Sequence, residues 1–222
     1  SKDQRMPSGW LAIHTFPNNK KIFCKEIQTN LLNLRYAYGS HERKEESMCG
    51  IVGYIGEKDA TPIILNGLKK LEYRGYDSAG LAVIENGSIA LRRDAGKLEK
   101  LITLVNNKPV SGNLGIGHTR WATHGVPSAN NAHPHISGNG KVVLVHNGIV
   151  ENFLELKQEL MAENVQFQSD TDSETIVLLV ERFLSSGKGL IDAARSTFEL
   201  LRGAHGIVLI SSDEPDKIVA AR

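Results

Sequence analysis

The stretch Met48-Cys49-Gly50-Ile51-Val52-Gly53-Tyr54-Ile55-Gly56 decides the fold, because it places a reactive side chain at the start of a buried strand. Residues 49–55 are short, apolar and interrupted by glycine, which is typical of a strand inside a sheet. At a chain start, Cys49 would carry a thiol and a free α-amine on one carbon, so nucleophile and base would lie together. The reference pKa values of the thiol (about 8.5) and of the α-amine (about 7.7–8.0) are close, so the amine could take the thiol proton near neutral pH. The alternative is a buried, unreactive cysteine.

The sequence before Cys49 differs in character from the rest of the chain. Basic residues outnumber acidic ones in 1–48, whereas the reverse holds in 49–222. Because 1–48 lack clear periodicity, we expect a separate, poorly ordered N-terminal extension with at most a short helix around Ile27–Tyr36. Acidic residues argue against a basic targeting helix. The extension blocks the nitrogen of Cys49, so we expect translation to start at Met48, or 1–48 to be removed, in the active protein.

Composition excludes several classes of protein. The 222 residues are 41% hydrophobic and 23% charged, with a net charge of +1, as in a soluble one-domain protein. No apolar run approaches the ~18 residues of a membrane helix, and no secretory signal is present. The charge balance predicts no nucleic-acid partner. Cys24 and Cys49 are too few for a disulfide framework, which favours reduced thiols and a cytoplasmic location.

Periodicity predicts strands, then helices, then strands again. Strands are expected at 49–55, 80–84, 88–94, 115–119, 141–146, 207–211 and 217–221, and helices at 61–71, 97–105, 153–163, 175–184 and 190–201. Asn86-Gly87 predicts a hairpin turn, and Thr171-Asp172-Ser173-Glu174 predicts a capping box. Because strands and helices do not alternate, we expect an α+β protein with antiparallel sheets and outer helices, truncated at its C-terminus.

One candidate binding segment is His118-Thr119-Arg120-Trp121-Ala122-Thr123-His124-Gly125. Arg120 could grip a carboxylate through two parallel hydrogen bonds, and Trp121 could cover an apolar side of a small substrate. The alternative is an ordinary strand end with a surface arginine and a packed tryptophan. The four histidines 118, 124, 133 and 135 match no metal-binding spacing, so we expect no metal and no cofactor.

Two further segments offer complementary groups. The Asn147 amide and the Gly148 N–H could form an oxyanion hole, although Asn-Gly is also a common turn. Asp172 could pair with a substrate ammonium, although a first-turn acid also suits the helix dipole.

Together these segments, with Leu71-Glu72-Tyr73-Arg74-Gly75-Tyr76-Asp77-Ser78-Ala79-Gly80, closely resemble a known family over 49–222. The resemblance is to the glutaminase domain of the isomerising glutamine–fructose-6-phosphate aminotransferases, which are class II glutamine amidotransferases. It does not extend to 1–47. The resemblance implies the N-terminal-nucleophile hydrolase fold, a four-layer α/β/β/α sandwich.

The resemblance also implies roles for individual residues. Cys49 would attack the side-chain amide of L-glutamine, releasing ammonia and leaving a γ-glutamyl thioester that water hydrolyses. Asn147 and Gly148 would form the oxyanion hole. Arg120, Thr123 and His124 would hold the carboxylate of the substrate, and Asp172 would hold its ammonium. Trp121 would help to close the pocket, and Arg74 would help to organise the Cys49 terminus.

The sugar-phosphate isomerase half of the family is absent from the sequence. Fructose 6-phosphate would therefore be a partner only through that missing half, and we expect the full-length enzyme to be a homo-oligomer. Two hypotheses remain open. One is a glutaminase domain that feeds ammonia to a synthase half, and the other is a folded but non-catalytic module whose Cys49 nitrogen stays acylated.

Overall fold

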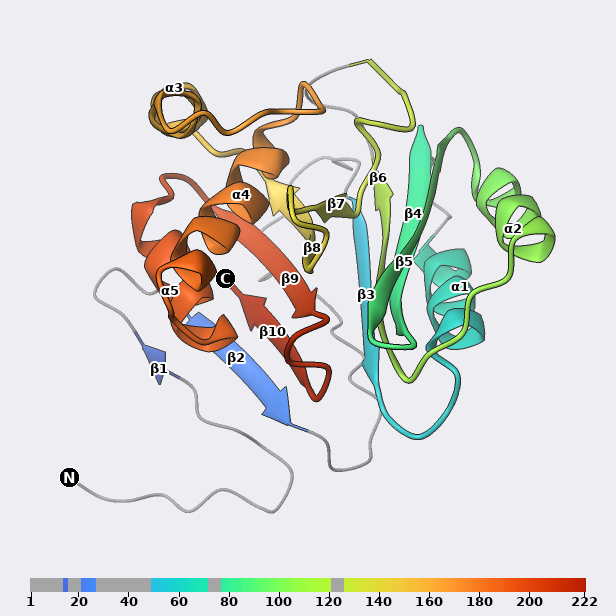
Figure 1. Ribbon diagram of the computed structural model, residues 1–222. Helices are drawn as coiled ribbons and strands as arrows, with labels where there is room; N and C mark the ends of the chain where they lie inside the picture. Colours follow the sequence, from blue (N-terminus) through green and yellow to red (C-terminus); the bar gives the residue numbers. More distant parts are fainter. Residues whose placement is uncertain (1–13, 16–20, 27–48, 72–76, 121–125) are drawn as a thin grey trace, which may run out of the picture.

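The computed structural model describes residues 14–15, 21–26, 49–71, 77–120 and 126–222. Two antiparallel sheets lie face to face (Figure 1). The first is four-stranded, in the order β3-β6-β4-β5. Its strands are β3 (Gly50–Ile55), β4 (Ser78–Glu85), β5 (Ser88–Ala95) and β6 (Leu114–Arg120).

The second sheet is six-stranded, in the order β1-β2-β10-β9-β8-β7. Its strands are β1 (His14–Thr15), β2 (Lys21–Glu26), β7 (His135–Ile136), β8 (Val142–Gly148), β9 (His205–Ser211) and β10 (Lys217–Ala221). All of its neighbouring strands pair antiparallel.

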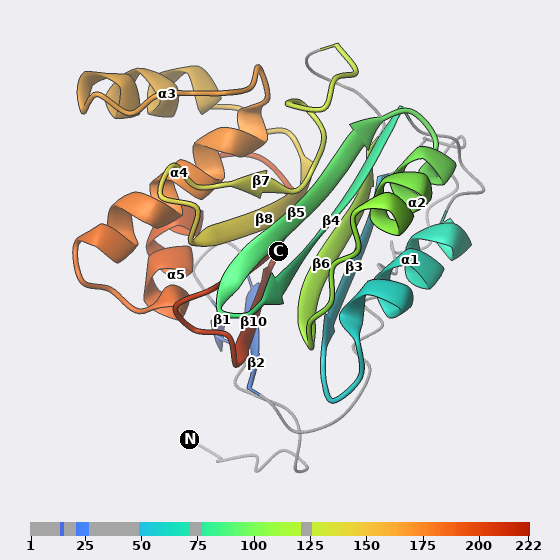
Figure 2. The same cartoon turned by 45° about the vertical axis from the view of Figure 1, so that its right-hand side comes forward.

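Helices cover both outer faces, which completes four layers (Figure 2). The helices are α1 (Ala60–Leu71), α2 (Leu98–Asn107), α3 (Phe153–Ala162), α4 (Asp172–Ser185) and α5 (Leu190–Leu200). Helices α1 and α2 pack on the four-stranded sheet, α4 and α5 lie over the six-stranded sheet, and α3 packs against α4. Within the described ranges, no helix has the length and apolar character needed to span a bilayer.

Three apolar clusters fill the spaces between these layers. One lies under α1 and α2 around Ile64 and Leu101, and another lies under α4 and α5 around Leu179 and Phe198. The third lies between the two sheets and includes Ile116, Val145 and Ile210, which are all fully buried. The expected α/β/β/α architecture is therefore confirmed, with one core between each pair of adjacent layers.

Local expectations agree with the structure in most of 49–222. The hairpin of β4 and β5 turns at Asn86 and Gly87, whose φ angles of 51° and 75° are both positive, as a type I′ turn requires. Strand β7 was not predicted, because two residues are too short to show alternation.

The capping box at the start of α4 is only half right. Thr171 is the N-cap residue, but its side chain makes no capping hydrogen bond. Its hydroxyl instead contacts Ser169 and His135, at 3.0 Å each. Glu174 accepts hydrogen bonds from the backbone N–H groups of Gln168 and Ser169 rather than from Thr171. The side chains of Thr171 and Glu174 therefore form these hydrogen bonds in place of the two hydrogen bonds of a capping box.

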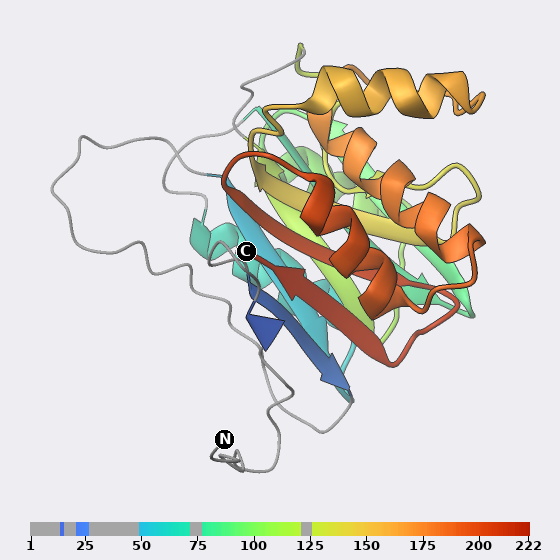
Figure 3. The same ribbon diagram turned by 90° about the vertical axis from the view of Figure 1, so that its left-hand side faces the viewer.

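Residues 21–26 differ from the expected separate extension. They form β2, which pairs with β10 from Lys217↔Glu26 to Ala221↔Ile22 and lies along its edge in Figure 3. The physical reason is that a strand edge exposes unpaired N–H and C=O groups, which another segment of the chain can satisfy. The expected helix at 27–36 lies outside the described residues.

Helix α3 provides a matched test of how strongly the core under α4 and α5 holds the fold. Leu160 is fully buried, whereas Leu154, in the same helix, is 63% exposed. We expect Leu160→Ala to lower the free energy of unfolding by about 2–5 kcal/mol, because it leaves a cavity. Leu154→Ala should change it by less than about 0.5 kcal/mol. Urea unfolding of both variants measures the difference, and equal losses would contradict the packing described.

Candidate functional site

Cys49 directly precedes β3 at one end of the four-stranded sheet and is partly buried. The pairing of Gly50 with Thr119 brings it beside the last residues of β6. A side chain at position 50 would collide with Leu71 and the Thr119 hydroxyl, so the glycine allows β3 and α1 to approach closely here. The predicted nucleophile therefore lies at a sheet end, next to the predicted carboxylate-binding segment.

Arg120 is the last residue of β6 and is only 4% exposed. Because side chains alternate along a strand, Arg120 points to the same side of the sheet as His118. Its charge is close enough to lower the pKa of His118, after the larger effect of burial. A buried guanidinium at this sheet end is suited to a substrate carboxylate, which can accept two parallel hydrogen bonds.

Asn147 and Gly148 are the last two residues of β8, paired with Gly206 and His205. The alternative of an Asn-Gly turn is therefore wrong. The Asn147 Nδ2 group donates to the carbonyl oxygen of Cys49 at 3.0 Å. Gly148 has a φ of 131°, and a side chain there would collide with the carbonyl oxygen of Ala204. The structure thus brings Asn147 from the facing sheet to the nucleophile residue.

Asp172 is the first residue of α4 and is 6% exposed. Its Oδ2 atom accepts the backbone N–H of Val150 at 2.7 Å. Val150 follows Gly148 by two residues, so this bond ties the carboxylate to the end of β8. Asp172 thereby lies next to the segment that directly follows Asn147 and Gly148.

A chain of hydrogen bonds runs behind Asp172. His205 Nε2 faces the carbonyl oxygen of Arg202 at 3.1 Å, and His205 Nδ1 faces His146 Nε2 at 3.1 Å. His146 Nδ1 in turn lies 2.9 Å from the Ser173 hydroxyl. Burial lowers the pKa of His146 to about 3, so its ring is neutral at physiological pH. The Ser173 hydroxyl also lies 3.3 Å from Asp172 Oδ1, so Ser173 joins Asp172 to His146.

His118 lies in the predicted binding segment, although sequence reasoning assigned it no role of its own. Its Nε2 atom lies 2.8 Å from Asn147 Oδ1. The only available signal was its place two residues before Arg120 on the same strand. Arg74, Trp121, Thr123 and His124, the other expected binding residues, lie outside the described residues.

Three buried imidazoles lie against one another beside Asn147, the first pair tilted by 31° and the second pair edge to face at 79°. The ring centroids of His118 and His133 are 4.3 Å apart, and those of His133 and His135 are 4.6 Å apart. Burial lowers the pKa of His118 to about 4 and the pKa values of His133 and His135 well below the usual value. In the part of the chain that the structure describes, no group of three or more His, Cys, Asp or Glu side chains is arranged to hold a metal ion.

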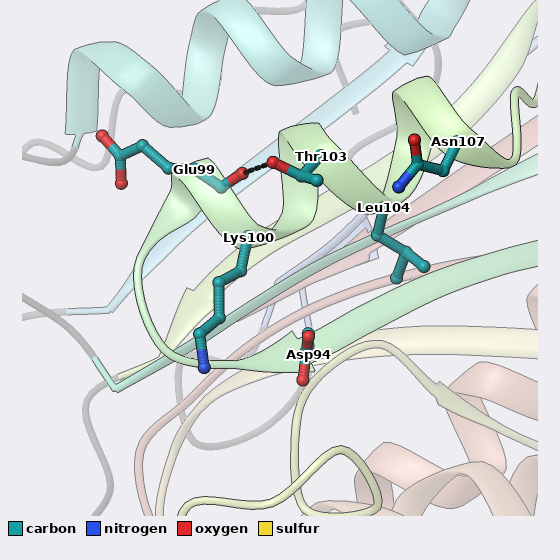
Figure 4. Close-up of a pocket in the computed structure, with 6 residues that line it drawn as sticks. All are labelled: Asp94, Glu99, Lys100, Thr103, Leu104 and Asn107. Carbon is teal, nitrogen blue, oxygen red and sulfur yellow. Dashed lines mark hydrogen bonds between the residues drawn. The ribbon is translucent and has the colours of Figure 1, made fainter.

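A surface groove of about 370 Å³ lies elsewhere, between the end of β5 and one face of α2 (Figure 4). None of the predicted site residues lines it. Its lining residues are Asp94, Glu99, Lys100, Thr103, Leu104 and Asn107. The Thr103 hydroxyl is already bonded to the carbonyl oxygen of Glu99 at 2.8 Å, within the helix itself.

Comparison with known proteins agrees with this geometry. The family described as a glutamine amidotransferase domain matches residues 106–213. The isomerising glutamine–fructose-6-phosphate aminotransferase of Chlorobaculum tepidum is 53% identical over 180 residues, or 79% of this chain. This chain contains a glutamine amidotransferase domain. The same enzyme of Pyrococcus horikoshii is 50% identical over 175 residues, and the chain spans 29% of the length of each of these curated relatives.

Two solved structures share the fold of this amidotransferase domain. Glutamine phosphoribosylpyrophosphate amidotransferase from B. subtilis superposes with a TM-score of 0.63 at 25% identity, covering 77% of this chain and 41% of its own. A structure titled as the allosteric regulatory enzyme of purine biosynthesis gives 0.63 at 26% identity, covering 78% and 41%. The expected N-terminal-nucleophile hydrolase fold is thus confirmed.

Proposed function

We propose that this domain hydrolyses L-glutamine to glutamate and ammonia, with Cys49 as nucleophile. The observation that carries the proposal is the hydrogen bond from Asn147 Nδ2 to the Cys49 carbonyl, which brings an amide donor from one sheet to the nucleophile on the other. A donor held at the nucleophilic residue can stabilise the negative charge of a tetrahedral intermediate that forms there.

The proposed reaction has two steps. The Cys49 sulfur attacks the amide carbon while its proton passes to the free α-amine, and the negative oxygen is held by Asn147 Nδ2 and the Gly148 N–H. The amine then protonates the leaving nitrogen, so ammonia departs and a γ-glutamyl thioester remains. Water attacks the thioester, releasing glutamate and restoring the thiol.

The proposed substrate contacts pair opposite charges. Arg120, with Thr123 and His124, holds the α-carboxylate, and Asp172 holds the α-ammonium. Trp121 covers the pocket, and Arg74 orders the Cys49 terminus. Two of these groups, Arg120 and Asp172, are buried in the structure, which strengthens their attraction to a charged substrate.

The names of the relatives suggest the wider role. In a full-length protein, the ammonia would serve the conversion of fructose 6-phosphate to glucosamine 6-phosphate by a part that the sequence lacks. We further propose a cytoplasmic, homo-oligomeric enzyme. The two cysteines favour the location, since a disulfide framework is absent from the sequence.

The experiment uses the intact chain and frees Cys49 in place. Residues 45–48 are replaced by the four-residue recognition sequence of a protease that cleaves after its last residue, and the folded protein is then cut. We call this product the cut chain. Release of both glutamate and ammonia from L-glutamine supports the proposal, and no release from a folded, fully cut chain refutes it.

Substrate selectivity tests the role of Asp172. Asp172→Asn keeps an oxygen for the Val150 N–H but loses the negative charge. In the cut chain, we expect kcat/KM for L-glutamine to fall about 10–100-fold, which corresponds to a hydrogen bond to a charged group. Turnover of glutaramic acid, which lacks the α-amine, should barely change. Asp170→Asn, at an exposed acid two residues earlier, is the control, and an equal loss for both substrates would contradict the role.

A further inference from the structure

The amide of Asn147 connects the two sheets through both of its polar atoms. Nδ2 donates to Cys49 at the start of β3, and Oδ1 contacts His118 Nε2 on β6 at 2.8 Å. These two strands are neighbours in the four-stranded sheet, whereas Asn147 belongs to the six-stranded sheet. The side chain of Asn147 is therefore held from the opposite sheet at both ends.

The partners decide which way the amide points. The Cys49 carbonyl oxygen can only accept, so the atom facing it is the NH₂ group of Asn147. The atom facing His118 is then Oδ1, which can only accept, so His118 carries a proton on Nε2. The rotated amide would place two acceptors against each other at Cys49 and remove the N–H group that an oxyanion needs.

The surroundings of His118 hold its ring in place. The ring is fully buried and stacks on His133, and the backbone on either side of His133 is anchored by Arg93, whose Nη1 group donates to the carbonyl oxygens of Ala132 and Pro134 at 3.0 and 2.9 Å. Burial also keeps the ring neutral by lowering its pKa to about 4. One proton then remains to be placed, and Asn147 Oδ1 fixes it on Nε2.

We propose that His118 is a positioning residue that fixes the Asn147 amide with Nδ2 toward Cys49. His118 does not touch the substrate in this proposal. It acts through Asn147, whose second N–H hydrogen is left to stabilise the oxyanion. The proposal rests on the glutaminase function proposed above and adds a residue that this function did not include.

The test uses the cut chain with two replacements. His118→Phe keeps a ring beside His133 but removes the donor, and we expect kcat for L-glutamine to fall about 10–100-fold with KM changed less than about twofold, as a partial loss of an oxyanion donor predicts. His118→Gln can place an amide N–H near the position of Nε2, and it should recover kcat to within about fivefold of the unmutated cut chain.

A second readout separates positioning from a general structural effect. An aldehyde analogue of glutamine forms a tetrahedral adduct with the thiol and engages the oxyanion hole, whereas glutamate binds without an adduct. His118→Phe should weaken the binding of the aldehyde by the same factor by which it lowers kcat. It should leave the affinity for glutamate unchanged. If His118→Phe does not fold, His118→Gln is compared with His118→Asn, whose shorter amide cannot reach Asn147 and should be slow.

Each outcome decides the proposal. The proposal is overturned if kcat is unchanged in the folded His118→Phe variant. It is also overturned if His118→Gln has the same kcat as the variant it is compared with, which is His118→Phe or His118→Asn. An equal loss of affinity for the aldehyde and for glutamate also overturns it, since that result indicates a general disruption of the pocket. The proposed function fails separately, when the unmutated cut chain releases no glutamate.

Discussion

Cutting the chain in front of Cys49 is expected to raise its rate of glutamine hydrolysis by about 10²–10⁴-fold, the usual contribution of a general base. The Cys49 thiol and the Asn147 amide are present in both forms. Only the α-amine changes, from an acylated nitrogen that cannot accept a proton to a free base. The measurement is glutamate release by the same preparation before and after the cut.

The Cys49→Ala chain is the control for this result. After the same cut, it should release no glutamate above background, because no thioester can form. Turnover by the alanine variant would remove Cys49 from the reaction. Equal turnover before and after the cut would instead show that the α-amine is not the base, and the non-catalytic alternative for the acylated chain would fail with it.

Replacing Asn147 is expected to produce the second largest effect. In the cut chain, Asn147→Ala should lower kcat by about 10²–10³-fold with little change in KM, because the amide donates mainly to charge that develops in the transition state. Asn147→Asp should be at least as slow, since a carboxylate repels both the Cys49 carbonyl and the oxyanion.

The control for Asn147 is Asn107→Ala, at an exposed asparagine at the end of α2. This variant should keep full activity. Steady-state kinetics with L-glutamine measures both constants for each variant. A rise in KM at constant kcat for Asn147→Ala would contradict the oxyanion assignment and favour ordinary ground-state binding.

Local sequence signals predicted most of the architecture of 49–222. Apolar spacing located α1 through Ile64 and Leu68, and Asn86-Gly87 located the hairpin, because these signals depend on neighbours a few residues apart. The pairing of Lys21–Glu26 with β10 depends on a strand near the other end of the chain. No local pattern in the sequence carries that information.

In the candidate site, too, local motifs predicted some features and the packing of distant segments determined the others. Cys49, Arg120, Asn147 and Asp172 were identified from motifs, and the structure places all four around the ends of β3, β6 and β8. The bonds that orient them join residues distant in sequence, such as Ser173 with His146 and Asn147 with His118. Motifs indicate which groups are present, whereas packing between the two sheets decides which atoms meet.

The position of β10 has a consequence for the order of folding. This strand lies between β9 and β2, so its two neighbours come from opposite ends of the sequence. When residues 1–48 are translated with the rest, β2 leaves the ribosome before β10 and cannot pair with it until residues 217–221 have emerged. The larger sheet therefore closes last and through contacts of very long sequence separation, which predicts slow folding. Until then the early strand is an exposed edge, and chaperones that shield such edges would bind the nascent chain.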